Sequence, residues 1–424
     1  MPKKNNIEFL ALIIPLAILI MPIKGTCDIH FYRAVPFFKE PRLEKPWLQS
    51  FDVWIGGGRT KKAHDGSKTK VALFDLYGVH QMQAVGDGIC KDFAKRLDNL
   101  IIKLSLLNSS PGFATFSIEG QFSSIEAGIR YAQNFDKGLF LECYLPIRSL
   151  KIDNLTFLDL SSNDTYPNIN DPYWIAFKNE LPTIMQEHGV FVTDWKDHGC
   201  GDLVVLGGFT MSHQETQEID FIDVTIQTGV SMPTGKKQDL SYAFALPFGY
   251  NKHWAIPVHF VSSIGAYEWL TVGMSIDALF LLAKSHEELR MKVSAQQSSI
   301  LLLNKGQARV HPGTIWSVAP FIKADHVIRG LSLAVGYTYA HQKTTYITPF
   351  DKEQFNYAIV NSDERFAGYV LHTLHATAEY DFTQQNWQYG PRIGITYNHQ
   401  ISGKRCFKTY IASITAGLEI AWDF

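Results

Sequence analysis

The sequence predicts an all-β protein: a single antiparallel transmembrane β-barrel of about 14 strands, within a range of roughly 12 to 16. Short turns are expected at one end and long loops with some helix at the other. Three observations predict this fold. The N-terminus has the order of a secretory signal, many segments alternate apolar and polar residues, and the connections between them alternate between short and long.

Residues 1–25 have the pattern of a signal peptide. Two lysines precede an apolar run at 9–21, and the small residues Gly25 and Thr26 follow. The run is shorter than the roughly 20 residues of a spanning helix, which favours cleavage near Gly25 over an uncleaved anchor. Lipidation at Cys27 is a further alternative, although the preceding residues lack a lipobox. Residues 26–424 then form one barrel domain, whose N-terminal segment is expected to be periplasmic or plug-like.

The last strand has the clearest alternation. Ala412, Ile414 and Leu418 fall on one face of a strand, and polar residues such as Glu419 fall on the other. This period of two is what a strand between lipid and a wet lumen requires. The terminal Phe424, with Trp422 two residues before it, resembles the assembly signal of bacterial outer-membrane barrels. The resemblance implies a place in the bacterial outer membrane, contact with its lipid, and recognition by the barrel-assembly machinery.

Thirteen other segments have strand patterns of the same kind. Together with the last, the predicted strands lie at 51–59, 71–78, 112–122, 124–134, 139–148, 202–211, 219–231, 254–264, 268–278, 314–325, 331–339, 374–382, 392–398 and 409–424.

The connections between these strands predict the topology. Those at 135–138, 212–218, 265–267, 326–328 and 383–387 are short, whereas those at 149–201, 232–253, 279–313 and 342–369 are long. Short periplasmic turns and long outer loops place both termini in the periplasm. The long connection at 79–111 and the short links near 123 and at 400–408 break this alternation. The strand register is therefore least secure in the N-terminal third.

Three stretches within the long connections have helical patterns, at 171–185, 277–293 and 89–107. Asp171 and Pro172 could cap the first of these helices, which Pro182 would kink. Such helices either pack on the rim of a barrel or fold into its lumen.

No motif predicts an enzyme, a metal site or a cofactor. The glycines at 56–58 lack the spacing of a phosphate-binding loop, and the five cysteines form no C-x-x-C pair. His372 and His375 fall on opposite faces of a strand, which prevents joint chelation. The net charge of -2 does not suggest a nucleic-acid partner. An outer-membrane hydrolase with dispersed catalytic residues is a remote alternative.

Charged residues on the predicted inner strand faces are candidates for lining the lumen. They are Glu119, Glu126, Arg130, Glu142, Arg148, Asp223, Asp277, Lys323, Glu379, Arg392 and Glu419. In an open pore they would set ion preference, and in a filled barrel they would be salt-bridged struts. Both interpretations remain open from the sequence.

The first functional hypothesis is a porin-like channel or transporter for small solutes. Apolar solutes are included because Phe113, Phe140, Tyr144 and Trp269 share the predicted inner face. The alternative is a structural or adhesion barrel at the cell surface, in which the loops carry the function.

Overall fold

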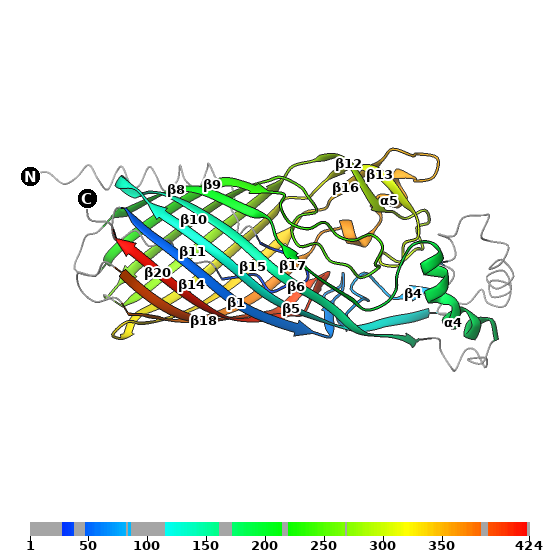
Figure 1. The fold of residues 1–424 in the computed structure, drawn as a ribbon, viewed down its shortest axis with the longest axis horizontal. Coiled ribbons are helices and arrows are strands. Elements are labelled where there is room, and N and C mark those ends of the chain that lie inside the picture. The colour runs from blue at the N-terminus through cyan, green and yellow to red at the C-terminus, as the bar shows by residue number, and fades with distance from the viewer. Residues whose placement is uncertain are drawn as a thin grey trace, which may run out of the picture.

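The computed structural model describes residues 28–37, 47–81, 84–85, 115–160, 172–213, 219–267, 269–382 and 389–421. Its main feature is a closed antiparallel barrel (Figure 1). Fourteen strands form one sheet; twelve of them close the barrel, and the short strands β4 (His80–Gln81) and β7 (Trp195–Cys200) each pair with one barrel strand only.

The barrel strands pair with their neighbours along the chain, so the topology is up-and-down. They are β1 (Leu48–Thr60), β5 (Thr115–Asn134), β6 (Leu139–Asp159), β8 (Leu203–His213), β9 (Ile219–Met232), β10 (Ala255–Ala266), β11 (Leu270–Leu281), β14 (Ile315–Ile328), β15 (Leu331–Gln342), β17 (Val370–Asp381), β18 (Tyr389–Lys404) and β20 (Tyr410–Ala421). β1 pairs with β20 and closes the barrel.

The strand count of twelve lies within the predicted range but below the expected 14. The described part of the segment 112–122, from Thr115 on, and the segment 124–134 belong to one strand, β5, which runs through Ser123 and Ser124 without a turn. The segment 71–78 is not a barrel strand: only β3 (Lys70–Ala72) forms there, in a small sheet with β2 (Lys62–His64) and β19 (Cys406–Phe407).

These two corrections restore the alternation of short and long connections except at the link between β18 and β20, which is short although it lies at the long-loop end. The chain from 61 to 114 becomes a single long connection between β1 and β5, at the same end as the other long ones. At the opposite end β5 and β6 are joined by the short η1 turn (Asp136–Gly138), where Lys137 and Gly138 have φ of 59° and 80°. Glycine accepts this left-handed backbone without a steric cost. The short turns mark the periplasmic end, which is on the left in Figure 1.

The long connections carry their own secondary structure. α4 (Pro172–Glu187) confirms the first predicted helix, with Pro182 inside it. The second predicted helix, at 277–293, is wrong: that stretch ends β11 and forms β12 (Lys284–Arg290), which pairs with β13 (Lys305–His311) and, through it, β16 (Tyr346–Pro349). Short helices α5 (Tyr357–Asn361) and η2 (Glu364–Phe366) precede β17. The third predicted helix, at 89–107, lies outside the described residues.

The outer surface of the barrel is apolar on every strand. Exposed apolar side chains on the twelve strands include Ile55, Ile125, Ile147, Met211, Ile226, Ile264, Val272, Ile322, Val335, Leu374, Ile395 and Ile414. In β20, Ile414 and Leu418 are exposed while Glu419 is buried, so the predicted faces of this strand are confirmed. The apolar outward and polar inward pattern is that of strands in contact with lipid.

Within the part of the chain that the structure describes, no helix is long and apolar enough to span a membrane.

The topology predicts where an exposed thiol can be labelled. Cys200 is exposed at the end that carries the long loops, whereas Cys406 is buried. A membrane-impermeant maleimide added to intact cells should therefore modify Cys200, as peptide mass spectrometry would show. A cysteine introduced by Lys137→Cys, in the turn at the other end, should react only after the outer membrane is permeabilised. Labelling of Lys137→Cys on intact cells, with Cys200 reacting only after permeabilisation, would show that the barrel has the opposite orientation in the membrane.

Candidate functional site: the filled lumen and the cavity above it

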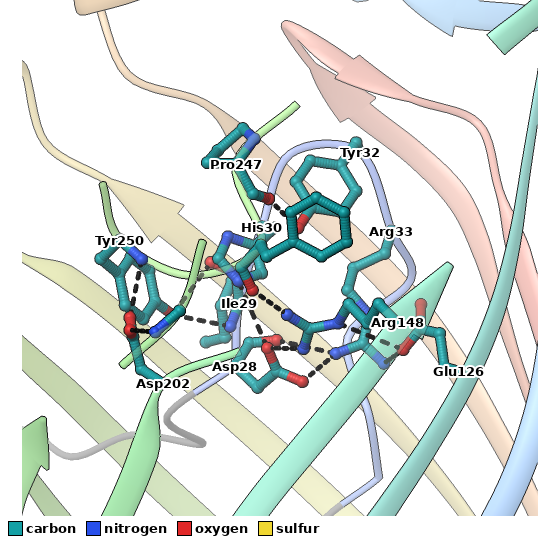
Figure 2. A network of polar contacts seen from close by, with 12 residues as sticks. Asp28, Ile29, His30, Tyr32, Arg33, Glu126, Arg148, Asp202, Pro247 and Tyr250 are labelled. Carbon is teal, nitrogen blue, oxygen red and sulfur yellow. Dashed lines mark hydrogen bonds and ion pairs between the residues drawn. The ribbon is translucent and has the colours of Figure 1, made fainter. Parts of the chain in front are cut away.

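The N-terminal segment, residues 28–37, lies inside the barrel (Figure 2). Asp28 and Arg33 form an ion pair, and Asp28 also pairs with Arg148 of β6. Arg33 Nη2 lies 2.6 Å from an oxygen of Glu126 on β5, and Arg148 Nε lies 3.7 Å from the same oxygen. All four side chains are almost completely buried. Two carboxylates and two guanidinium groups therefore balance each other in the lumen.

Neutral contacts hold the same segment along its length. The backbone oxygen of Ile29 accepts hydrogen bonds from the hydroxyls of Tyr369, at 2.8 Å, and Tyr250, at 3.2 Å. The Tyr32 hydroxyl donates to the backbone oxygen of Pro247 at 2.7 Å. Phe37, at the end of the segment, packs edge-on against Phe321 of the barrel wall. The segment is anchored by polar groups at one end and by aromatic rings at the other.

A second charged cluster lies on the inner face of five neighbouring strands, closer to the periplasmic end. Arg392 of β18 lies 2.7 Å from Asp52 of β1 and pairs with Glu419 of β20. Arg130 of β5 lies 3.1 Å from Asp52 and 2.6 Å from Glu142. The strand pairing puts these side chains on neighbouring strands at one level, so each guanidinium bridges two carboxylates. Such groups are buried only when paired in this way.

The structure thus brings together six of the sequence-predicted residues in two clusters. Among the others, Asp277 is buried, with His259 Nδ1 at 2.9 Å and Ser317 as a further partner. Lys323 is partly exposed and lies 2.8 Å from Asp325. Asp223 and Glu379 are half-buried. That any of these residues lines a path for solutes stays a prediction.

Glu119 is the exception among the predicted lumen residues. Its side chain is about half exposed, and it lies 3.9 Å from Lys62. Because β5 is one continuous strand, a single alternation applies from end to end. It places Glu119 on the same outer face as the exposed Ile125, opposite to the buried Glu126. The prediction treated residues 112–122 as a separate strand and so assigned them to the wrong face.

Sequence reasoning missed Asp52 and the charged residues of the N-terminal segment. Asp52 could have been found, because it alternates with the outward Phe51 and Val53 in a predicted strand. Asp28 and Arg33 could not, because the residues around them show neither a period of two nor a helical pattern. Trp422 and Phe424, the predicted assembly signal, lie outside the described residues.

A cavity of about 280 Å³ lies between the N-terminal segment and the outer loops. His30 and Phe31 belong to its floor, and its walls come from the loops before β10, β14 and β17 and from the tip between β18 and β20. Its apolar lining includes Phe31, Phe74, Leu76, Tyr77, Leu240, Phe244, Leu246, Tyr250, Ile300, Val310, Ile315, Ile347, Phe366, Tyr369 and Phe407. Small-molecule sites in proteins are lined mainly by apolar and aromatic side chains of this kind. The cavity volume of about 280 Å³ is close to the lower end of their usual range, about 300 Å³.

The polar groups of the cavity wall mainly tie the loops together. Arg290 donates to four backbone oxygens: those of Leu240 at 2.7 Å, Leu302 at 3.3 Å, Leu303 at 2.6 Å and Gly189 at 2.7 Å. Burial, with a smaller effect of the nearby Arg365, lowers the pKa of Arg290 to about 10, so it stays cationic at neutral pH. Arg365 pairs with Asp363 at 2.7 Å. The described residues contain no group of side chains that could hold a metal ion.

No protein family model and no curated protein matches this chain. Among solved structures, an outer membrane channel from Pseudomonas putida F1 is 14% identical, with a TM-score of 0.49 over 93% of this chain and 99% of that chain. The NanC porin is 9% identical, with a TM-score of 0.30 over 72% of this chain and 99% of that one. The Pseudomonas putida toluene transporter TodX is 9% identical, with a TM-score of 0.24 over 88% of each chain. These values are too low to carry a substrate over to this chain.

The closed barrel, its apolar outer surface and its short turns at one end define a bacterial outer-membrane β-barrel protein. The fold class and the location predicted from the sequence are confirmed at this level.

Proposed function

We propose that the protein is an outer-membrane channel for small, mainly apolar solutes, with residues 28–37 as its plug. The observation that carries the proposal is the cavity of about 280 Å³, apolar in its lining and placed directly above the plug. A solute arriving from outside would lose its contact with water there, which is favourable for apolar surface and costly for charged groups.

The filled lumen supports this choice over an open aqueous pore. At the plug the charged side chains are engaged in ion pairs, Asp28 and Glu126 with Arg33 and Arg148, and they leave no excess of one sign there. Passage of a solute therefore requires that the plug segment moves. Its contacts with the loops, through Tyr250 and Tyr369, connect the floor of the cavity to the walls that a bound solute would touch.

A cavity-filling substitution tests the proposal. Ala243 lines the cavity, and Ala243→Trp should occupy part of its volume and reduce toluene uptake toward that of cells lacking the protein. The measurement is the initial uptake rate of radiolabelled toluene by intact cells with equal amounts of assembled barrel.

The matched control is Ala295→Trp, which adds the same side chain at an exposed alanine in the same group of loops, away from the cavity lining. It should leave the uptake rate unchanged. Equal uptake by both variants and the unmodified protein would show that the cavity is not on the route of the solute.

A further inference from the structure

A belt of aromatic and histidine side chains covers the outer face of four neighbouring strands near the loop end. We call this group the rim belt: Trp316 of β14, Tyr337, Tyr339 and His341 of β15, His372 of β17 and His399 of β18. Trp316 Nε1 donates a hydrogen bond to His341 Nδ1 at 3.0 Å, and the ring of Tyr339 lies 5.2 Å from those of Trp316 and His372. The belt side chains of β14, β15 and β17 thus form one connected surface, and His399 stacks on Tyr397 beside it.

The strand register places the rim belt outside the barrel. Tyr337 and Tyr339 alternate with the buried Thr338 and Ala340, and they continue the face of the exposed Val335. Below the belt this face carries only apolar side chains on β15, namely Val335 and Leu333. The surface therefore changes from apolar to aromatic and polar toward the loop end, as at the border between lipid chains and headgroups.

Four lysines lie next to the rim belt. Lys404 is on the same cross-strand row as His341, because both residues pair with Val370. Lys343 follows His341 by two residues, and Lys408 precedes Tyr410, the partner of His399 across the strands, by two residues. Lys68 lies in the turn between β2 and β3, and its charge reaches His372. In the part of the chain described, none of these four lysines has a carboxylate oxygen within 4 Å.

The acidic residues on the same elements are already engaged. Asp65 accepts hydrogen bonds from the backbone N–H groups of Ser67 and Thr69, both at 2.8 Å. Glu364 pairs with Arg405. Among the described residues, the four lysines on this side of the rim therefore exceed the nearby free carboxylate charge, which is that of Asp65.

Three lysines elsewhere at the loop end do have carboxylate partners. Lys151 pairs with Asp153, Lys236 lies 2.6 Å from Asp197, and Lys237 lies 3.9 Å from Glu287. Lysines without a carboxylate partner also occur elsewhere among the described loop-end residues, for example Lys196 of β7, but the four at the rim belt lie together beside aromatic side chains. An anionic partner from outside the chain fits this group of lysines, because they lie where the apolar outer face gives way to aromatic and polar side chains.

We propose that the rim belt and Lys68, Lys343, Lys404 and Lys408 bind the phosphate groups of a phosphorylated lipid in the outer leaflet. Basic side chains next to a membrane attract anionic headgroups. The tyrosine, tryptophan and histidine side chains would lie at headgroup depth, and the acyl chains would pack on the apolar band below them. This site lies outside the barrel and does not depend on the proposed transport function.

The test compares two triple variants by native mass spectrometry with diphosphoryl lipid A as the probe. At about 1 kcal/mol for each lysine near a membrane surface, Lys343→Gln/Lys404→Gln/Lys408→Gln should bind the lipid roughly a hundredfold more weakly. The control Lys151→Gln/Lys236→Gln/Lys237→Gln removes the same charge elsewhere at the loop end and should bind it like the unmodified protein. Heat-modifiable migration in electrophoresis would show that each variant is an assembled barrel.

A dephosphorylated lipid A with the same acyl chains should bind the unmodified protein weakly. Equal binding of both lipids, or equal binding by the two variants, would overturn the proposal. Complete displacement of the lipid by millimolar inorganic phosphate would also overturn it, because it would indicate a site for free anions.

Discussion

Replacing residues 28–37 by a glycine–serine stretch of the same length should turn a closed barrel into a conducting one. The replacement removes the ion pairs of Asp28 and Arg33 and the ring of Phe37, which hold the segment in the lumen. A flexible polar linker has no comparable reason to stay inside. Twelve strands enclose a wider space than the eight-stranded barrels that side chains alone can fill. Discrete conductance steps in a planar bilayer are therefore expected for the variant, and long closed periods for the unmodified protein.

The unmodified protein, the replacement variant and the single variant Phe37→Ala form a graded series. Phe37→Ala keeps every ion pair of the segment and should open the barrel only for brief intervals. If the replacement variant is assembled, as judged by heat-modifiable migration, and is as silent as the unmodified protein, the segment is not the plug. That result would favour the alternative of a structural or adhesion barrel at the cell surface over a transport function.

Arg392→Met should cause the largest loss of stability among single substitutions in the lumen. Without Arg392, the carboxylates of Asp52 and Glu419 stay buried, and Arg130 is the one guanidinium left in the cluster for these two and Glu142. Breaking a buried pair from one side costs about 3 to 5 kcal/mol. Urea unfolding in detergent micelles, followed by tryptophan fluorescence, would measure the free energy of unfolding.

Two further variants test the reason for this loss. Arg392→Met/Asp52→Asn/Glu419→Gln removes the two carboxylates as well and should recover a large part of the stability. Lys323→Met breaks a partly exposed pair with Asp325 on an inner strand face and should change stability by about 1 kcal/mol or less. If Arg392→Met is no more harmful than Lys323→Met, the cluster is hydrated and does not act as a strut.

The barrel could be predicted because each lipid-facing strand carries its own signal. Alternation in β18 and β20 depends on lipid on one side and a polar interior on the other, and neither requires knowledge of distant residues. The predicted number of strands was too high because a local residue pattern suggested a turn inside one strand. Ser123 and Ser124 look like a turn, but pairing with β1 and β6 on both sides keeps them in a strand of 20 residues.

The contents of the barrel were harder to predict than its wall. The stretch at 284–290 has helix-favouring glutamate and leucine, but pairing with β13 makes it a strand, so tertiary contacts override propensity. The lumen residues on the strands could be proposed from alternation, whereas their partners in the N-terminal segment could not. The position of Asp28 is determined by Arg148, which is 120 residues away in the sequence.

The partners of the N-terminal segment also fix a sequence of events during biogenesis. Arg148 belongs to an early strand, Tyr369 and Thr373 to the region of β17, and Phe407 to the tip just before the last strand. The segment precedes the first strand of the chain, yet its full set of contacts exists only once the chain is folded as far as Phe407, just before the last strand. We expect the segment to dock late. The lumen should therefore contain water at first and lose it to the docking segment as the seam between β1 and β20 closes.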